Sequence, residues 1–137
     1  MAETRKTGRR TSVRAKVNVP EEDAYGHVQP QALEIEEGGG GALMIEQDAY
    51  SQVSEILRPE SFYDHRHQLI YEAIRTLNLQ QKPVDILTVT EHLNSMGKLE
   101  EVGGPFYITQ LSGKVASSAH IEYHARIIAQ KSLAREL

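Results

Sequence analysis

A broad apolar stripe at helical spacing is the feature that most constrains how this chain can fold. Between residues 65 and 79 the stripe consists of Leu69, Ile70, Ala73, Ile74 and Leu77, at positions i, i+1, i+4, i+5 and i+8. With 3.6 residues per turn, these side chains share one wide face of a helix. The pattern therefore predicts a helix over residues 65–79 with one face buried in a core, preceded by Phe62 and Tyr63 as core anchors.

Capping residues indicate further short helices on both sides of this one. Asp85 is a typical N-cap for a helix through Leu93, and Gly97 stands just past its end. The β-branched residues 88–90 make a short strand the alternative, but the apolar spacing favours a helix. Asp48 similarly begins a short helix that Pro59 is expected to stop.

The remaining helices are predicted at the C-terminal end of the chain. Residues 103–104 are glycines and Pro105 follows, a typical turn and first helical position before a helix over residues 106–111. Ser117 and Ser118 are expected to cap a long last helix from about residue 119. All these segments favour helix, so the fold class is all-α.

Four consecutive glycines interrupt the first apolar segment. Residues 32–37 and 42–47 both have helical patterns, but Gly38–Gly41 separate them. Glycine inside a helix costs roughly 1 kcal/mol relative to alanine. We therefore expect the run to break or fray a first helix.

The charge is distributed unevenly along the chain. Residues 1–20 hold six basic residues and one acidic residue, a net charge of +5, whereas residues 21–137 hold nine basic and eighteen acidic residues, a net charge of −9. Residues 1–30 also contain few apolar side chains, so we expect a disordered basic N-terminal arm. The acidic remainder would repel phosphates, so a DNA-binding module could rest only on the arm.

Several kinds of chemistry are excluded or disfavoured by the residues present. The chain has no cysteine, hence no disulfide or thiolate ligand, and no apolar run of about 18 residues that could cross a membrane. The segments around Gly97-Lys98 and Gly113-Lys114 lack the upstream glycine and the hydroxyl residue of a nucleotide-binding phosphate loop. We therefore expect no catalytic residue and no cofactor in this chain, and a cytoplasmic location.

Histidines and paired acids offer no convincing metal or acid–base site. His120 and His124 have metal-ligand spacing on a helix, but no third ligand is near, so surface or interface histidines are expected. His67 is expected to pack and form hydrogen bonds near the start of its helix, with Asp64 and His65 beside it. The pairs Glu36-Glu37 and Glu100-Glu101 have the pattern of solvated faces.

The last helix carries apolar residues on two faces. Ile121, Ala125 and Ile128 share one face, and Tyr123, Ile127 and Ala134 lie on another. Either both faces are buried within one monomer, or one packs on the preceding helix and the other meets a second subunit. The predicted self-association or partner interface consists of Phe106, Leu111, Ile121, Tyr123, Ile127 and Ile128.

Several segments in the same order resemble the N-terminal domain of DnaB-type bacterial replicative DNA helicases. The resemblance covers about residues 28–137, although the glycines at 38–40 and the basic arm depart from the family pattern. The segments that carry it are residues 30–36, 41–44, 57–63, 65–71, 83–89, 99–104, 107–111 and 120–128.

This resemblance implies a helical head over residues 31–101 and a C-terminal helical hairpin over residues 102–137 that pairs between subunits. The head and hairpin would form a collar on a hexameric ring that recruits primase. A helicase loader is a further implied partner. ATP, Mg²⁺ and DNA would be bound by a RecA-like motor domain beyond residue 137, joined by a linker. The alternative is a stand-alone helical adaptor for protein–protein contacts.

Overall fold

The described part of the chain is an all-α bundle, as the sequence predicts. A computed structural model describes residues 30–114 and 121–136. No helix in these two segments is long and apolar enough to cross a membrane. Seven elements follow in order: α1 (Pro30–Ile45), α2 (Ala49–Val53), the 3₁₀ turn η3 (Pro59–Ser61), α3 (His65–Leu79), α4 (Ile86–Ser95), α5 (Gly104–Ser112) and α6 (Ile121–Glu136).

The strongest sequence predictions are confirmed in α3 and α4. Helix α3 has the predicted bounds, and its stripe residues Ile70, Ala73, Ile74 and Leu77 are buried. Helix α4 forms in place of the alternative strand. Asp85 accepts a hydrogen bond from the Thr88 backbone N–H at 2.8 Å, and the Asp85 N–H donates to Thr88 Oγ1 at 3.0 Å.

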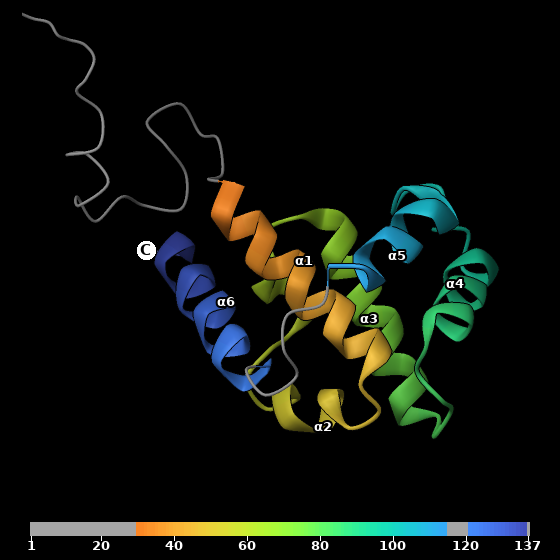
Figure 1. Cartoon of the computed structure of the whole chain (residues 1–137), viewed down its shortest axis with the longest axis horizontal. Coiled ribbons are helices and arrows are strands. Elements are labelled where there is room, and N and C mark those ends of the chain that lie inside the picture. Colours follow the sequence, from red (N-terminus) through yellow and green to blue (C-terminus); the bar gives the residue numbers. More distant parts are fainter. Residues whose placement is uncertain (1–29, 115–120, 137) are drawn as a thin grey trace, which may run out of the picture.

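The expected break at the glycine run is wrong. Helix α1 passes without interruption through Gly38–Gly41, and all four glycines are buried. The helix lies between α5 and α6 and also packs on α3, so tertiary contacts surround this segment (Figure 1). Burial of the neighbouring Ala42, Leu43 and Met44 offsets the low helix propensity of glycine, since packing routinely overrides propensity.

Smaller differences concern where elements begin and end. Helix α2 ends at Val53, and Pro59 begins the 3₁₀ turn η3 instead of stopping the helix. The predicted arm ends one residue too late, because Pro30 begins α1. Residues 1–29 of that arm and the predicted Ser117–Ser118 cap lie outside the described residues.

The last two helices are arranged differently from a hairpin packed on itself. Helices α5 and α6 lie on either side of α1 (Figure 1). Helix α6 packs mainly on α1, α2 and η3, whereas α5 packs on α1 and α4. One common core therefore joins residues of α1 to α6. Its largest fully buried side chains are Tyr71, Phe62, Leu43, Ile70, Ile74, Ile108 and Leu111.

Candidate functional site: a buried polar network and two exposed surfaces

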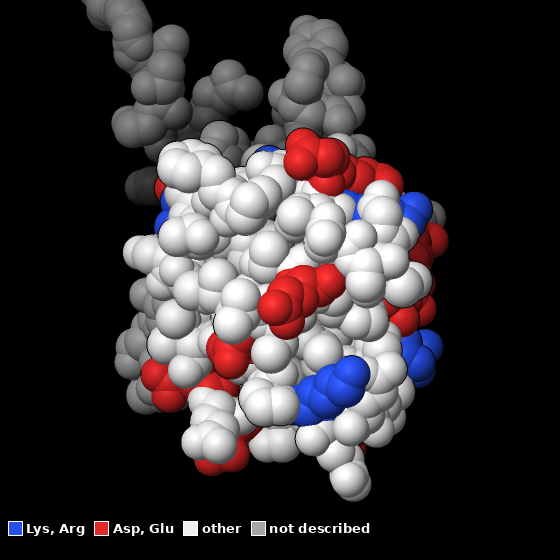
Figure 2. All heavy atoms as spheres, turned by 90° about the vertical axis from the view of Figure 1, so that its right-hand side faces the viewer, with Lys and Arg blue, Asp and Glu red and all other residues white. Residues whose placement is uncertain are grey.

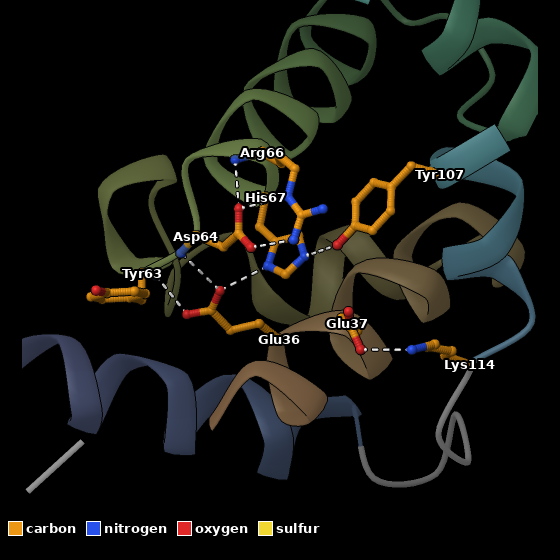
Figure 3. A network of polar contacts seen from close by, with 8 residues as sticks. All are labelled: Glu36, Glu37, Tyr63, Asp64, Arg66, His67, Tyr107 and Lys114. Carbon is orange, nitrogen blue, oxygen red and sulfur yellow. Dashed lines mark hydrogen bonds and ion pairs between the residues drawn. The ribbon is translucent and has the colours of Figure 1, made fainter. Parts of the chain in front are cut away.

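A carboxylate in the middle of α1 organises the most polar part of the interior. Glu36 Oε2 accepts a hydrogen bond from the Tyr63 backbone N–H at 2.5 Å, and Oε1 accepts from the Asp64 N–H at 3.2 Å (Figure 3). Oε1 also lies 2.8 Å from His67 Nδ1. The prediction of a solvated face is wrong for Glu36 because three donors replace its water shell.

His67 links this carboxylate to a third helix. Its Nε2 lies 2.6 Å from the Tyr107 hydroxyl, and the two rings stack with centroids 6.0 Å apart. A neutral imidazole with the proton on Nδ1 can donate to Glu36 and accept from the Tyr107 O–H. Both ring nitrogens of His67 then have a hydrogen-bond partner. The predicted packing and hydrogen bonding of His67 near the start of α3 is confirmed.

Asp64 and Arg66 form a second layer over this chain of hydrogen bonds. Asp64 caps α3 by accepting from the Arg66 N–H at 2.9 Å, and its carboxylate also binds the Arg66 guanidinium at 2.6 and 3.0 Å. Burial raises the pKa of Asp64, but the Arg66 hydrogen bonds and the nearby His67 outweigh it and leave that pKa below its usual value. The Arg66 guanidinium lies 4.2 Å from the centre of the Tyr107 ring, and burial raises the pKa of the Tyr107 phenol.

The network holds three helices together and shows no catalytic geometry. Glu36 and His67 are nearly inaccessible to solvent, so no substrate can reach them. His65 points elsewhere and binds the exposed Glu101 at 2.7 Å, as expected for alternate positions on a helix. Among the described residues no group of three potential metal ligands occurs. The arrangement therefore fixes the relative positions of α1, α3 and α5.

The six predicted interface residues divide into core and surface. Leu111, Ile121 and Ile128 are buried in the monomer, so they stabilise the fold and offer no free surface. Phe106 is 76% exposed and Tyr123 is 64% exposed, while Ile127 is half-buried. Phe106 therefore contributes little to the core of the monomer.

The α6 helix has one buried and one exposed face. Ile121, Ala125, Ile128 and Ser132 are buried against the bundle. Tyr123 and Leu133 stand on the outside, Leu133 with 62% of its surface exposed. The monomer therefore does not bury both faces of α6, since Tyr123 and Leu133 remain exposed. Sequence reasoning missed Leu133 because it fits neither of the two stripes.

A second exposed surface lies on the side of the molecule that carries α4. Uncharged side chains cover most of this side, with charged groups scattered among them (Figure 2). Large exposed apolar residues on α3 to α5 are Leu79, Leu87, Met96 and Phe106. Only Phe106 was predicted, since single apolar residues outside a stripe give no periodic signal.

Comparison with known proteins identifies the family of this bundle. The model of the DnaB-like helicase N-terminal domain matches residues 28–130. The chain belongs to this family. The resemblance carried by its sequence motifs is thereby confirmed.

Relatives of this DnaB-like domain are replicative helicases. The chain is 50% identical over 128 residues to the replicative DNA helicase DnaB of Rhodothermus marinus, covering 93% of this chain and 13% of the relative. It is 42% identical over 108 residues to the replicative DNA helicase DnaC of Bacillus subtilis, covering 79% of this chain and 24% of the relative. The chain thus spans a quarter or less of the length of these relatives.

A solved DnaB N-terminal domain has the same fold. The crystal structure of this domain from Mycobacterium tuberculosis superposes with a TM-score of 0.74 at 34% identity, covering 85% of this chain and 78% of that one. A DnaB-like replicative helicase, solved in a study of its interactions with primase, superposes with a TM-score of 0.68 at 24% identity, covering 76% of this chain and 24% of that one.

Proposed function

We propose that this domain is the collar part of a hexameric, ATP-dependent replicative DNA helicase in the bacterial cytoplasm. In this role it pairs with other copies and recruits primase during DNA replication. A helicase loader is a further partner of the assembly. Unwinding of DNA, with ATP and Mg²⁺, belongs to a RecA-like motor domain that follows residue 137 in the full-length protein.

The observation that carries the proposal is that α6 of a DnaB-type domain leaves large apolar side chains exposed. Tyr123 and Leu133 are large and solvent-exposed, although the opposite face of the same helix is buried in the bundle. Large exposed apolar side chains, aromatic ones in particular, are enriched where proteins meet. One relative of the same fold was solved in a study of its interactions with primase, which supports primase as the partner.

Sedimentation of the chain alone and with the primase of the same organism tests the proposal. We expect concentration-dependent self-association and a shared boundary with primase. The double variant Tyr123→Ala/Leu133→Ala should weaken self-association, primase binding or both. The matched control is Lys82→Ala/Glu91→Ala, which truncates two exposed charged residues away from α6 and should behave as wild type.

The contrary result is a chain that stays monomeric and sediments separately from primase at every concentration. The gene provides a second check, because a phosphate loop encoded after Leu137 is required for a motor domain. A stop codon there would favour the stand-alone adaptor.

A further inference from the structure

A polar pocket opens between α2, η3 and the second half of α3, away from the Glu36 network. Its volume is about 400 Å³, within the range of pockets that hold small molecules. Leu57 and Pro59 contribute apolar walls, and the other lining side chains are all polar or charged. These are Tyr50, Ser54, Arg58, Glu60 and Arg75.

Two guanidinium groups in this pocket have few or weak partners. Arg58 makes no side-chain hydrogen bond or ion pair with the described residues, whereas Arg66 and Arg126 are held by neighbouring carboxylates and Arg135 by the Ser61 carbonyl. The ion pair between Arg75 and the Glu72 carboxylate is long, at 4.0 Å, and both side chains are about half exposed. Such a contact contributes little, so Arg75 can bind another anion.

The backbone that carries Arg58 is fixed by several hydrogen bonds. The Arg58 N–H donates to Ser61 Oγ at 3.0 Å, and the Ser61 N–H donates to the Arg58 carbonyl at 2.9 Å. Arg135 of α6 binds the Ser61 carbonyl at 3.1 Å. The pocket wall is therefore preorganised, which lowers the entropic cost of binding.

Other lining residues are anchored in the core through Tyr71. Its hydroxyl donates to the Leu57 carbonyl at 2.9 Å, and its ring lies 5.8 Å from the ring of Tyr50. Tyr50 is half-buried, so its ring is held in place while it lines the pocket.

We propose that this pocket binds a small phosphate monoester with the size and polarity of a nucleoside monophosphate. The planar guanidinium groups of Arg58 and Arg75 bind the phosphate oxygens, a pairing in which arginine forms two parallel hydrogen bonds. Glu60 and the Ser54 hydroxyl accept hydrogen bonds from sugar hydroxyls. Because Glu60 would repel a polyphosphate, the site favours a single phosphate. This inference is independent of the helicase role.

Isothermal titration of the purified chain with AMP, in buffer without phosphate, tests the proposal. We expect saturable binding of AMP, weaker binding of inorganic phosphate, and no binding of adenosine or citrate. Arg58→Ala and Arg75→Ala should each weaken AMP binding at least about tenfold, the loss of one charge-assisted pair. Arg126→Ala on α6 is the matched control and should change the affinity less than twofold.

The substitutions are at exposed positions, and an unchanged circular dichroism spectrum would show that each variant is folded. Arg58→Lys keeps the charge without the planar fork and should bind with intermediate affinity. The proposal is overturned if AMP does not bind, if adenosine or citrate binds as well as AMP, or if Arg58→Ala binds AMP as tightly as Arg126→Ala does.

Discussion

The carboxylate of Glu36 on α1 lies 2.8 Å from Nδ1 of His67 on α3, although the two residues are 31 positions apart in sequence. Only 4% of the Glu36 side chain and 2% of the His67 side chain are exposed. A charged group in this position is tolerated only when its hydrogen bonds are complete. The backbone N–H groups of Tyr63 and Asp64 complete them, so the start of α3 is built around a residue of α1.

We predict that Glu36→Ala strongly destabilises the domain. Removing the carboxylate leaves two backbone donors and the His67 ring without their acceptor, and each buried donor left unsatisfied costs about 1–3 kcal/mol. Urea unfolding followed by circular dichroism measures the change. Glu122→Ala removes an acid from an exposed pair with Arg126 and should cost less than about 1 kcal/mol. Equal effects of the two substitutions would show that the network does not stabilise the fold.

The lowered pKa of Asp64 predicts that the domain loses stability in acid. Its pKa in the folded chain is below the ordinary pKa of an aspartate, so folding favours the ionised carboxylate. This contribution is complete above the unfolded pKa and is lost as the pH falls through the lower folded value. Asp64→Asn keeps an N-cap acceptor but cannot ionise.

The stability difference between wild type and Asp64→Asn should therefore shrink as the pH falls from 7 to below about 4, measured by urea unfolding. The control is Asp48→Asn, at an exposed N-cap position of α2 whose side chain makes no capping hydrogen bond. A difference that stays constant with pH would contradict the ionic role of Asp64.

The helices that the sequence predicted best are α3, from its apolar stripe, and α4, from its cap and its apolar spacing. Asp85 and Gly97 bracket α4, and the stripe of α3 places its bounds, because these signals act over a few neighbouring residues. The glycine run in α1 was misread because its stability comes from α5 and α6, which are distant in sequence.

The polar network escaped prediction for a related reason. Glu36 is buried and Glu37 only partly buried, although the two look alike in sequence. Hydrogen bonds from the Tyr63 and Asp64 N–H groups distinguish Glu36. The same applies to the pocket lined by Arg58 and Arg75, which lie on separate elements. For the interface, the two faces of α6 were visible in the sequence, whereas the burial of Leu111 depends on how α5 docks on α1.

Gly40→Ala should stabilise the domain. A Cβ at this interior position of α1 has no heavy atom within 4 Å, and a small cavity of about 10 Å³ adjoins it beside Leu43 and Phe62. Alanine improves helix propensity by up to about 1 kcal/mol, and the midpoint of urea unfolding should rise accordingly. At Gly39 a Cβ would lie 3.4 Å from Ile128 Cδ1, so Gly39→Val should overpack the α1–α6 contact and lower the midpoint. If Gly40→Ala lowered the midpoint of urea unfolding, there would be no room for a Cβ at this position.

Gly103→Ala should be more damaging than Gly97→Ala. Both glycines have positive φ, +101° and +71°. An alanine in this left-handed region of backbone conformation costs roughly 1–2 kcal/mol. Only at Gly103 would the new Cβ also meet a neighbour, 2.9 Å from Tyr107 Cβ. Shifting Tyr107 would stretch its hydrogen bond to His67, so urea unfolding should show a larger loss for Gly103→Ala. Equal losses would indicate that the Tyr107 side chain can move without cost.

The exposed face of α6 predicts weak self-association that Ile127→Glu abolishes. Ile127 is half-buried beside the exposed face that carries Tyr123, and a two-fold axis would bury that face on both chains at once. Without motor domains to raise the local concentration, we expect a concentration-dependent dimer by light scattering. A buried carboxylate at position 127 would disfavour the dimer while leaving the helical circular dichroism largely unchanged.

Ile128→Glu is the matched control, because Ile128 is in the monomer core and this substitution should unfold the bundle. If Ile127→Glu also unfolded the protein, Ile127 would belong to the core. If the wild type remained monomeric at high concentration, the α6 face would not mediate self-association in this chain.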